Sequence, residues 1–333
     1  MSDKKLGWGI VGLGMGRNRA IKATQAEGAE LRCVCSIEPG KAELVGKELG
    51  ADWTMDYEEM LDRADIDVVG VMSPSGLHCD FVIQALEAGK HVHTTKPMDI
   101  SVAKTDAAIA AAKKAGKILA VDFDSRYNPI NHQIRMALQQ GKLGKLICAD
   151  LIMKWYRDMS YYGGGSPAGW RSRKATEGGS IANQGVHFVD LLQWFLGPVK
   201  SVMGRSGTFN HPIETEDQTM AMVEFQSGAW AALHTTTCST PDLGSVIEIN
   251  GSQGALLWKD NDITLYHSAV DPDTKLADIP VDPNLPRNII EDMVSAITKG
   301  TKVQCDGYEG RKSVQIFTAI YESSRTGSII PIK

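Results

Sequence analysis

Two short segments of the chain carry residues suited to proton and charge chemistry. Lys96 stands directly before Pro97, whose ring restricts the backbone, and both follow a short apolar run typical of a strand. Asn183, His187 and Asp190 are spaced by four and three residues, which predicts that they share one face of a helix. An ammonium group at the carboxyl end of a strand, with an imidazole that can exchange a proton, indicates a nicotinamide-dependent dehydrogenase.

The segment of His187 also allows a structural interpretation. Ser180 follows two glycines and is expected to cap the helix, which Gly197 and Pro198 end. Apolar residues fill most of the turns between them, so the helix is predicted to be buried. His187 is then either a general base that its neighbours orient, or a core histidine whose nitrogens are satisfied by hydrogen bonds.

The first third of the chain alternates strand-like and helical patterns. The expected strands cover residues 8–11, 31–36, 68–72, 91–93 and 118–121, and the expected helices cover 18–27, 41–49, 78–88 and 102–114. This alternation predicts a doubly wound parallel sheet, as in a Rossmann domain.

After residue 123 the pattern changes to consecutive strands joined by turns. Strands are expected between residues 145 and 267, after a helix over 129–139, and two helices over 287–298 and 308–324 are expected to complete this part. The predicted organisation is therefore α/β, with an NAD(P)-binding Rossmann domain over 1–123. A substrate-binding and oligomerisation domain over 124–333 would be α+β, with a large, mostly antiparallel open sheet.

A glycine-rich loop follows the first expected strand and opens a helix. Its candidate cofactor-binding residues are Gly12, Gly14, Met15, Gly16 and Arg17. Such a loop lets a pyrophosphate approach backbone amides at a helix N-terminus. The usual spacing would place the third glycine where Arg17 stands, so the loop is one residue short.

The end of the second expected strand bears on the choice between NAD and NADP. Ser36 stands where NAD enzymes usually offer a carboxylate to the ribose, and Lys41 follows one helical turn later. Both residues favour NADP slightly. Glu38 could instead supply the carboxylate that favours NAD, and Lys41 could lie on a solvated helix surface.

Several further motifs run through the whole chain. They are Ser73-Pro74 with His78, residues 85–97, residues 126–129, Trp170-Arg171, the helix of His187, and residues 306–311. With the glycine loop, these motifs make the chain resemble the glucose–fructose oxidoreductase, inositol dehydrogenase and rhizopine-catabolism (Gfo/Idh/MocA) family of dehydrogenases. The joint match is specific for the family and does not identify a substrate.

The resemblance implies roles for individual residues. Lys96 would contact the substrate and the nicotinamide, and His187 would exchange the hydroxyl proton. Thr95 stands where the family motif has glutamate, and Asn183 stands where many members have aspartate. Asn183 can orient a hydroxyl group but cannot take its proton, so a carboxylate-assisted relay is in doubt.

The remaining candidates complete the two predicted binding sites. Cofactor contacts are also expected from Ser73, Pro74, His78, Lys96 and Pro97. Substrate contacts are expected from Lys96, Arg126, Tyr156, Tyr161, Trp170, Arg171, Asn183 and His187.

Composition and charge limit the classes of partner. Hydrophobic residues make up 43% of the 333 residues and the net charge is −5, so neither nucleic acid nor a membrane is expected. No signal peptide is recognised, which favours the cytoplasm. His91 and His93 lie in a strand with no third ligand nearby, and no metal site is expected.

The predicted function is an NAD(P)-dependent oxidoreductase that transfers a hydride between nicotinamide and a ring carbon of a sugar, glycoside or cyclic polyol. A cofactor-dependent glycosidase that oxidises its sugar only transiently is one alternative. A non-catalytic dinucleotide-sensing regulator is the other. The open face of the expected second sheet needs a cover, so a homodimer or homotetramer is predicted.

Overall fold

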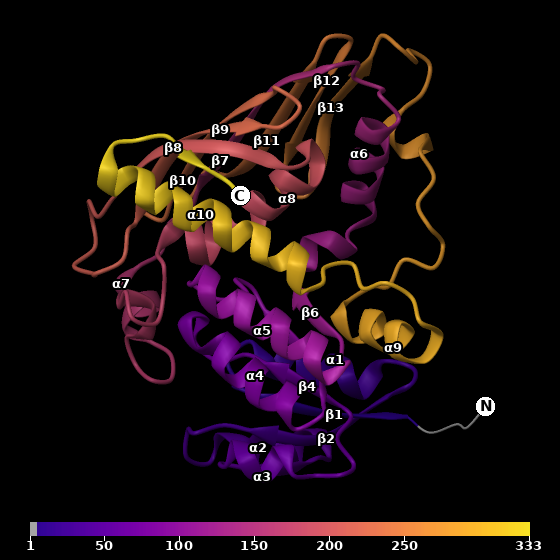
Figure 1. Ribbon diagram of the computed structural model, residues 1–333, viewed down its shortest axis with the longest axis vertical. Coiled ribbons are helices and arrows are strands. Elements are labelled where there is room, and N and C mark those ends of the chain that lie inside the picture. The colour runs from indigo at the N-terminus through magenta and orange to yellow at the C-terminus, as the bar shows by residue number, and fades with distance from the viewer. Residues whose placement is uncertain (1–4) are drawn as a thin grey trace. The chain divides into compact units, whose positions relative to one another are not determined.

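The computed structural model describes residues 5–333, and it divides into two compact units. The first unit contains the chain up to Asp124 together with Gly164–Trp170 and Pro286–Arg311, and the second contains Ser125–Gly163, Arg171–Leu285 and Lys312–Lys333. Each unit is built around its own sheet (Figure 1).

Within the described residues, the first unit has a six-stranded parallel sheet in the order β3-β2-β1-β4-β5-β6. Its strands are β1 (Leu6–Val11), β2 (Ala29–Cys35), β3 (Asp52–Thr54), β4 (Val68–Val71), β5 (His91–Thr95) and β6 (Leu119–Asp122). This is the strand order of a Rossmann fold, which reverses between β1 and β4. The carboxyl ends of these two neighbouring strands therefore mark the expected ligand site, and the predicted doubly wound parallel sheet is confirmed.

Helices connect the strands of this sheet. They are α1 (Gly16–Gln25), α2 (Lys41–Leu49), α3 (Tyr57–Leu61), α4 (His78–Glu87) and α5 (Val102–Ala115), and α4 and α5 lie side by side (Figure 1). The short elements β3 and α3 were not predicted, because three and five residues are too few to show a hydrophobic period.

The first unit also includes a helix from much later in the chain. Helix α9 (Ile289–Lys299) packs against α1, β2 and β6, with Ile289, Ile290 and Met293 buried. The sequence places this helix with the second domain. Its amphipathic pattern shows that one face must be buried, but cannot show against which sheet.

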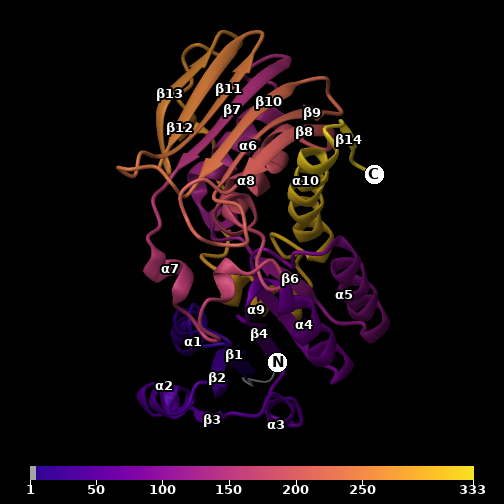
Figure 2. The ribbon, with the colours of Figure 1, turned by 90° about the vertical axis from the view of Figure 1, so that its left-hand side faces the viewer.

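The second unit has a sheet whose described strands follow the order β13-β12-β11-β7-β10-β9-β8-β14 (Figure 2). The strands are β7 (Leu146–Lys154), β8 (Val199–Gly207), β9 (Gln218–Phe225), β10 (Trp230–Thr236), β11 (Gly244–Gly251), β12 (Gly254–Lys259), β13 (Asp262–Ser268) and β14 (Ile330–Pro331). Neighbours are antiparallel except β7 and β10, which pair in parallel at the centre. The predicted large, mostly antiparallel sheet is confirmed.

The helices of this unit are α6 (Pro129–Gln139), α7 (Met159–Gly163), α8 (Val186–Leu196) and, from Lys312 on, α10 (Gly307–Thr326). Helix α8 contacts β7, and α10 lies beside β8, where Ser323 Oγ accepts a hydrogen bond from the Gly204 amide at 3.0 Å (Figure 2). Along β9 and β10, buried Val223, Phe225 and Leu233 alternate with more exposed residues. One face of the sheet therefore forms the core of the unit.

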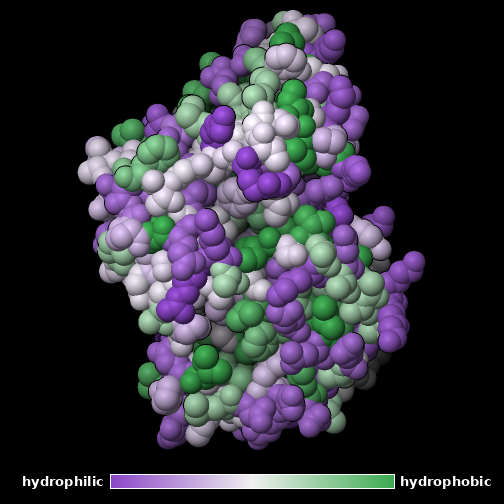
Figure 3. Space-filling model, turned by 60° about the vertical axis from the view of Figure 1, so that its left-hand side comes forward, coloured by the Kyte–Doolittle hydropathy of each residue, from purple (hydrophilic) through white to green (hydrophobic). Residues whose placement is uncertain are grey.

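On the side of the molecule seen in Figure 3, hydrophilic and hydrophobic residues are interspersed. Among the described residues, no helix combines the length and the apolar character needed to cross a bilayer.

Candidate active site

The glycine loop lies at the carboxyl ends of β1 and β4. Gly12 has φ +86°, and a Cβ atom there would lie 2.3 Å from the carbonyl oxygen of Met72, so any other residue would strain the backbone and clash with it. A Cβ atom at Gly14 would meet nothing within 4 Å. The loop therefore passes close to β4 at Gly12 and leaves open space beside Gly14.

Gly16 takes the place of the third glycine of the usual motif, although it stands one residue earlier in the sequence. It is the first residue of α1, and its Cβ atom would lie 3.1 Å from Ile10 and 3.2 Å from Met72. It thus allows the close packing of helix on strand that the third glycine of the usual motif provides. Arg17, which occupies that third position, instead pairs with Glu48, and Met15 is exposed.

The residues beside this loop fit a dinucleotide. Helix α1 begins without a side-chain cap at Met15, and no described residue bonds to the buried hydroxyl of Ser73. Ser73 and Pro74 follow β4, whose carboxyl end lies beside that of β1. Uncapped amides and a buried hydroxyl without a protein partner are what a pyrophosphate and a ribose require.

Ser36, Glu38 and Lys41 form a local cluster after β2. Ser36 is buried and its Oγ accepts a hydrogen bond from the Glu38 amide at 3.2 Å, while Lys41 Nζ lies 2.8 Å from the Glu38 carboxylate. Lys41 is therefore already paired with an acid. The preference for NADP stays a prediction, and the pair with Glu38 weighs against it.

His78 links the segments that follow β4 and β5. Its Nδ1 lies 2.7 Å from the carbonyl oxygen of Pro97, and its Nε2 lies 2.6 Å from that of Ser73. Burial lowers the pKa of His78 to about 4, so the ring is neutral at pH 7 and donates to only one of these carbonyls. Lys96 is half-buried beside Pro97, directly after β5. The structure thus places the imidazole against the backbone that carries Lys96.

In the second unit, Asn183 is the centre of a hydrogen-bonded network. Its Nδ2 donates to Glu177, and its Oδ1 accepts from the hydroxyl of Tyr161 at 2.7 Å and from Nε2 of Gln184 at 2.8 Å. The guanidinium of Arg171 lies 4.8 Å from the centroid of the Tyr161 ring. The structure therefore brings together three of the predicted substrate contacts, Asn183, Tyr161 and Arg171.

The backbone that carries Asn183 differs from the prediction. Ile181–Gly185 is a π-helix, and α8 begins only at Val186. Ser180 has helical dihedral angles and makes no cap; its hydroxyl donates to Glu216 at 2.7 Å, and Glu216 also accepts a hydrogen bond from the Ile181 amide at 2.7 Å. A carboxylate from a distant segment thus replaces the predicted serine cap.

His187 and Asp190 have different surroundings. His187 is half-buried in the first turn of α8, whereas Asp190 is fully buried and accepts hydrogen bonds from Nε and Nη2 of Arg126 at 2.8 and 2.7 Å. Arg126, expected at the substrate, is 1% exposed and holds α8 through this pair. Asp190, which the spacing places on the same helix face as His187, is therefore paired with Arg126.

The remaining substrate candidates lie in surface segments. Tyr156 is exposed just after β7, where its ring centroid lies 6.5 Å from that of His211. Trp170 lies beside Arg171 in the short 3₁₀ helix Trp170–Ser172. The substrate role of these two aromatic residues stays a prediction.

Three side chains of the second unit carry atoms that could bind a metal ion. They are His211, Asp217 and Cys238, whose ligand atoms lie within 4.8 Å of one another. Hydrogen bonds explain this group without an ion. Asp217 accepts hydrogen bonds from the amides of Phe209, Asn210 and His211 and lies 3.0 Å from His211 Nδ1. Burial raises the pKa of the Cys238 thiol to about 12, so the thiol is protonated at pH 7.

Comparisons with known proteins agree with this architecture. Residues 6–123 match the model of the oxidoreductase family with an NAD-binding Rossmann fold, and residues 131–257 match the GFO/IDH/MocA C-terminal domain. The scyllo-inositol 2-dehydrogenase (NAD(+)) of Bacillus subtilis is 30% identical over 73% of this chain and 71% of its own. The 1,5-anhydro-D-fructose reductase of Ensifer adhaerens is 27% identical over 98% of both chains.

Solved structures show the same fold. The WlbA dehydrogenase from Chromobacterium violaceum, in complex with NADH and UDP-GlcNAcA, has a TM-score of 0.90 and 31% identity over 100% of this chain and 97% of its own. The WlbA dehydrogenase from Bordetella pertussis, with the same two ligands, has a TM-score of 0.90 and 28% identity over 99% of both chains.

The fold and the glycine loop define an oxidoreductase with a Rossmann domain that binds a nicotinamide dinucleotide. The chain belongs to the GFO/IDH/MocA oxidoreductase family.

Glu177, Gln184 and Glu216 are polar residues of this region that were not predicted. Gln184 directly follows Asn183, but neighbouring residues of a helix point in different directions, and Glu177 and Glu216 stand at no recognisable spacing from the predicted residues. Their positions depend on contacts that only the folded unit creates, such as the bond from Ser180 to Glu216.

Proposed function

We propose that this protein is an NAD(P)-dependent dehydrogenase or reductase that acts on a ring CH–OH or C=O group of a sugar, glycoside or cyclic polyol. Membership of the family, with relatives named for inositol and anhydro-sugar substrates over most of the chain, is the observation that carries the proposal. The neighbours crystallised with NADH and UDP-GlcNAcA extend the candidate substrates to sugar acids carried on nucleotides.

The residues of the chain then have separate tasks. The glycine loop and Ser73 bind the dinucleotide, which supplies hydride transfer when bound. Lys96 donates a hydrogen bond to the reacting oxygen and stabilises its developing negative charge. His187 exchanges the proton of that hydroxyl, and Asn183 with Tyr161 orients the sugar.

A substrate screen with both cofactors tests the proposal. Inositols, anhydro-sugars, pyranosides, uronic acids and nucleotide-linked uronic acids are incubated with NAD or NADP, and absorbance is followed at the wavelength of the reduced nicotinamide. We expect turnover of at least one class. Nucleotide binding without turnover of any class would contradict the proposal and support a sensor. Release of an aryl group from an aryl glycoside without net reduction would indicate a glycosidase.

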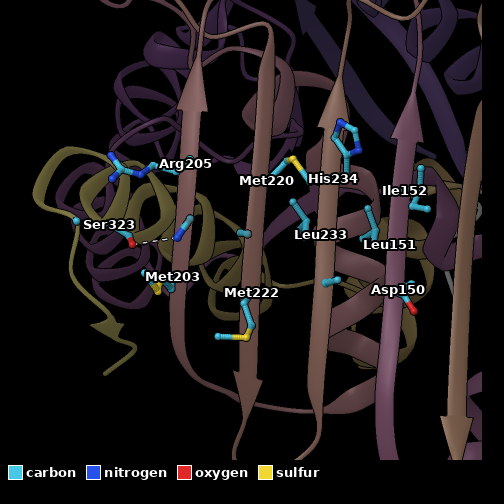
Figure 4. A pocket seen from close by; sticks show the side chains of 14 residues that line it. Asp150, Leu151, Ile152, Met203, Arg205, Met220, Met222, Leu233, His234 and Ser323 are labelled. Atoms are coloured by element: carbon cyan, nitrogen blue, oxygen red, sulfur yellow. Dashed lines mark hydrogen bonds between the residues drawn. The ribbon is translucent and has the colours of Figure 1, made fainter.

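We also propose that a second copy of the chain covers the open face of the eight-stranded sheet. On this face Met220, Met222 and Trp230 are 53%, 44% and 55% exposed, although β9 and β10 are interior strands of the sheet. A hollow on the same face is lined by residues including Ile152, Met203, Met220, Met222 and His234 (Figure 4). Large exposed apolar side chains gathered on one face of a sheet favour an interface between protein chains.

Light scattering after gel filtration tests this interface. We expect a dimer or tetramer for the wild-type protein and smaller species for Met220→Glu/Met222→Glu, because two charges at the centre would be buried without partners. The exposed variant Met55→Glu, in the first unit, is the control and should leave the oligomer unchanged. A monomeric wild-type protein would exclude the interface.

A further inference from the structure

The amide of Asn183 has only one orientation that its neighbours permit. Its partner on one side is the carboxylate of Glu177, which accepts hydrogen bonds, so Nδ2 must face Glu177. Oδ1 then faces Tyr161 and Gln184, whose hydroxyl and amide groups lie at 2.7 and 2.8 Å and can donate. Glu177 therefore decides which end of Asn183 meets Tyr161.

Glu177 is itself held in place before the π-helix. Its side chain is buried, with 2% of the residue exposed, and its Oε1 accepts a hydrogen bond from the amide of Gly178 at 2.9 Å. Its own amide donates to the carbonyl oxygen of Arg173 at 2.9 Å. A buried carboxylate needs such donors, and the amide of Asn183 is another of them.

The hydroxyl of Tyr161 has a defined hydrogen-bonding state as a result. It donates to Asn183 and accepts from Nε2 of Gln184 at 2.8 Å. A phenol oxygen can accept two hydrogen bonds, so one acceptor position remains for a donor such as a sugar hydroxyl. Reversing the amide of Asn183 would force the tyrosine hydroxyl to accept from it and would remove this arrangement.

Burial keeps the phenol of Tyr161 protonated. Burial raises its pKa, and the negative charge of Glu177 adds to the rise. The guanidinium groups of Arg171 and Arg157, 4.8 and 5.7 Å from the ring centroid, act in the opposite direction. Tyr161 therefore serves as a neutral hydroxyl group.

We infer that Glu177 is a positioning residue for the proposed oxidoreductase reaction, acting through Asn183 to set the hydrogen-bonding direction of the Tyr161 hydroxyl toward the sugar. The inference rests on the proposed function. Many members of the family have a carboxylate at position 183, where this chain has an amide. Here the carboxylate is that of Glu177, which accepts a hydrogen bond from Asn183.

An exchange of acid and amide tests the inference. The variants are Asn183→Asp, Glu177→Gln and the double variant, in which the amide introduced at position 177 would donate to the carboxylate introduced at position 183. Asn183→Asp places two carboxylates in contact, so one must bind a proton and its pKa rises. We expect kcat of this variant to fall roughly tenfold or more at pH 8, as for one lost hydrogen bond, and to recover as the pH is lowered.

The double variant separates positioning from a merely structural effect. It restores one acid and one amide, so we expect kcat at pH 8 to return to within about threefold of wild type, without the added pH dependence. Glu214→Gln is the matched control, because this exposed acid binds the nearby Lys174 amide at 3.1 Å and lies outside the network. A wild-type kcat and pH profile for Asn183→Asp, or a double variant no better than the single ones, would overturn the inference.

Thermal melting distinguishes failure of this inference from failure of the proposed function. If the wild-type protein oxidises no sugar, the proposed function fails, and the contact is tested by stability alone. Tm of Asn183→Asp should then fall relative to wild type as the pH rises, because the paired acids are stable only while they share a proton. Tm of the double variant should not. Equal pH dependence in all variants would overturn the inference.

Discussion

Glu216 makes a specific contribution to the pH dependence of folding. Its carboxylate accepts hydrogen bonds from the Ile181 amide, the Ser180 hydroxyl and, at 3.1 Å, the Tyr321 hydroxyl. Burial is the largest influence on it and raises its pKa from 4.5 to about 7, even though these three donors oppose the rise. The ionised form is therefore less favourable in the folded protein than in the unfolded chain.

The size and direction of the effect follow from this rise. A pKa raised from 4.5 to about 7 corresponds to about 3 kcal/mol of unfolding free energy. Because the folded pKa is the higher one, this stability is fully present below pH 4.5 and is lost as the pH rises through 7. Glu216→Gln has no proton to lose and should not show this contribution.

Urea denaturation of wild type and Glu216→Gln between pH 4 and pH 8 measures the contribution. We expect the stability of the wild type relative to the variant to decrease by about 3 kcal/mol over this range. Glu214→Gln, which replaces an exposed acid two residues away, should follow the wild-type profile. A stability difference between wild type and Glu216→Gln that stays constant with pH would refute the reasoning.

Three further predictions concern the cofactor, the reaction and the core. Lys96→Ala should lower kcat roughly 10²- to 10³-fold with dinucleotide affinity retained, and near wild-type kcat in the folded variant would exclude its role. Glu38→Gln should raise the NADP/NAD ratio of kcat/KM, because it removes a negative charge and releases Lys41 from its ion pair. An unchanged ratio would show that neither Glu38 nor Lys41 contacts the adenosine ribose of the cofactor. Asp190→Asn should destabilise the fold by about 3 kcal/mol in denaturant titration, because it removes the carboxylate that compensates the buried charge of Arg126; a loss under about 1 kcal/mol would contradict this.

The sequence predicts the elements of this protein more fully than the contacts of its site. The strand–helix alternation of the first unit and the position of the glycine loop both follow from local patterns, and α2 and α6 begin and end at the residues expected. Lys96 is placed after β5 for the same reason.

Features that depend on distant partners were missed. The π-helix that carries Asn183 begins at Ile181, whose amide binds Glu216, a residue with no pattern that connects it to this segment. The parallel pairing of β7 and β10 likewise depends on how the chain crosses the sheet between them. Local propensity does not predict which partner a backbone group binds, because several partners would satisfy the same group.

The position of α9 has a consequence for how the chain acquires its structure during synthesis. The last strand of the first sheet ends at Asp122, but α9, which begins at Ile289, buries Ile289, Ile290 and Met293 within that unit. A ribosome must therefore release the chain beyond Lys299 before α9 can cover this part of the nucleotide-binding unit. Such long-range contacts slow folding and leave the apolar surface that α9 covers on α1 and β2 exposed in the nascent chain until α9 has been made.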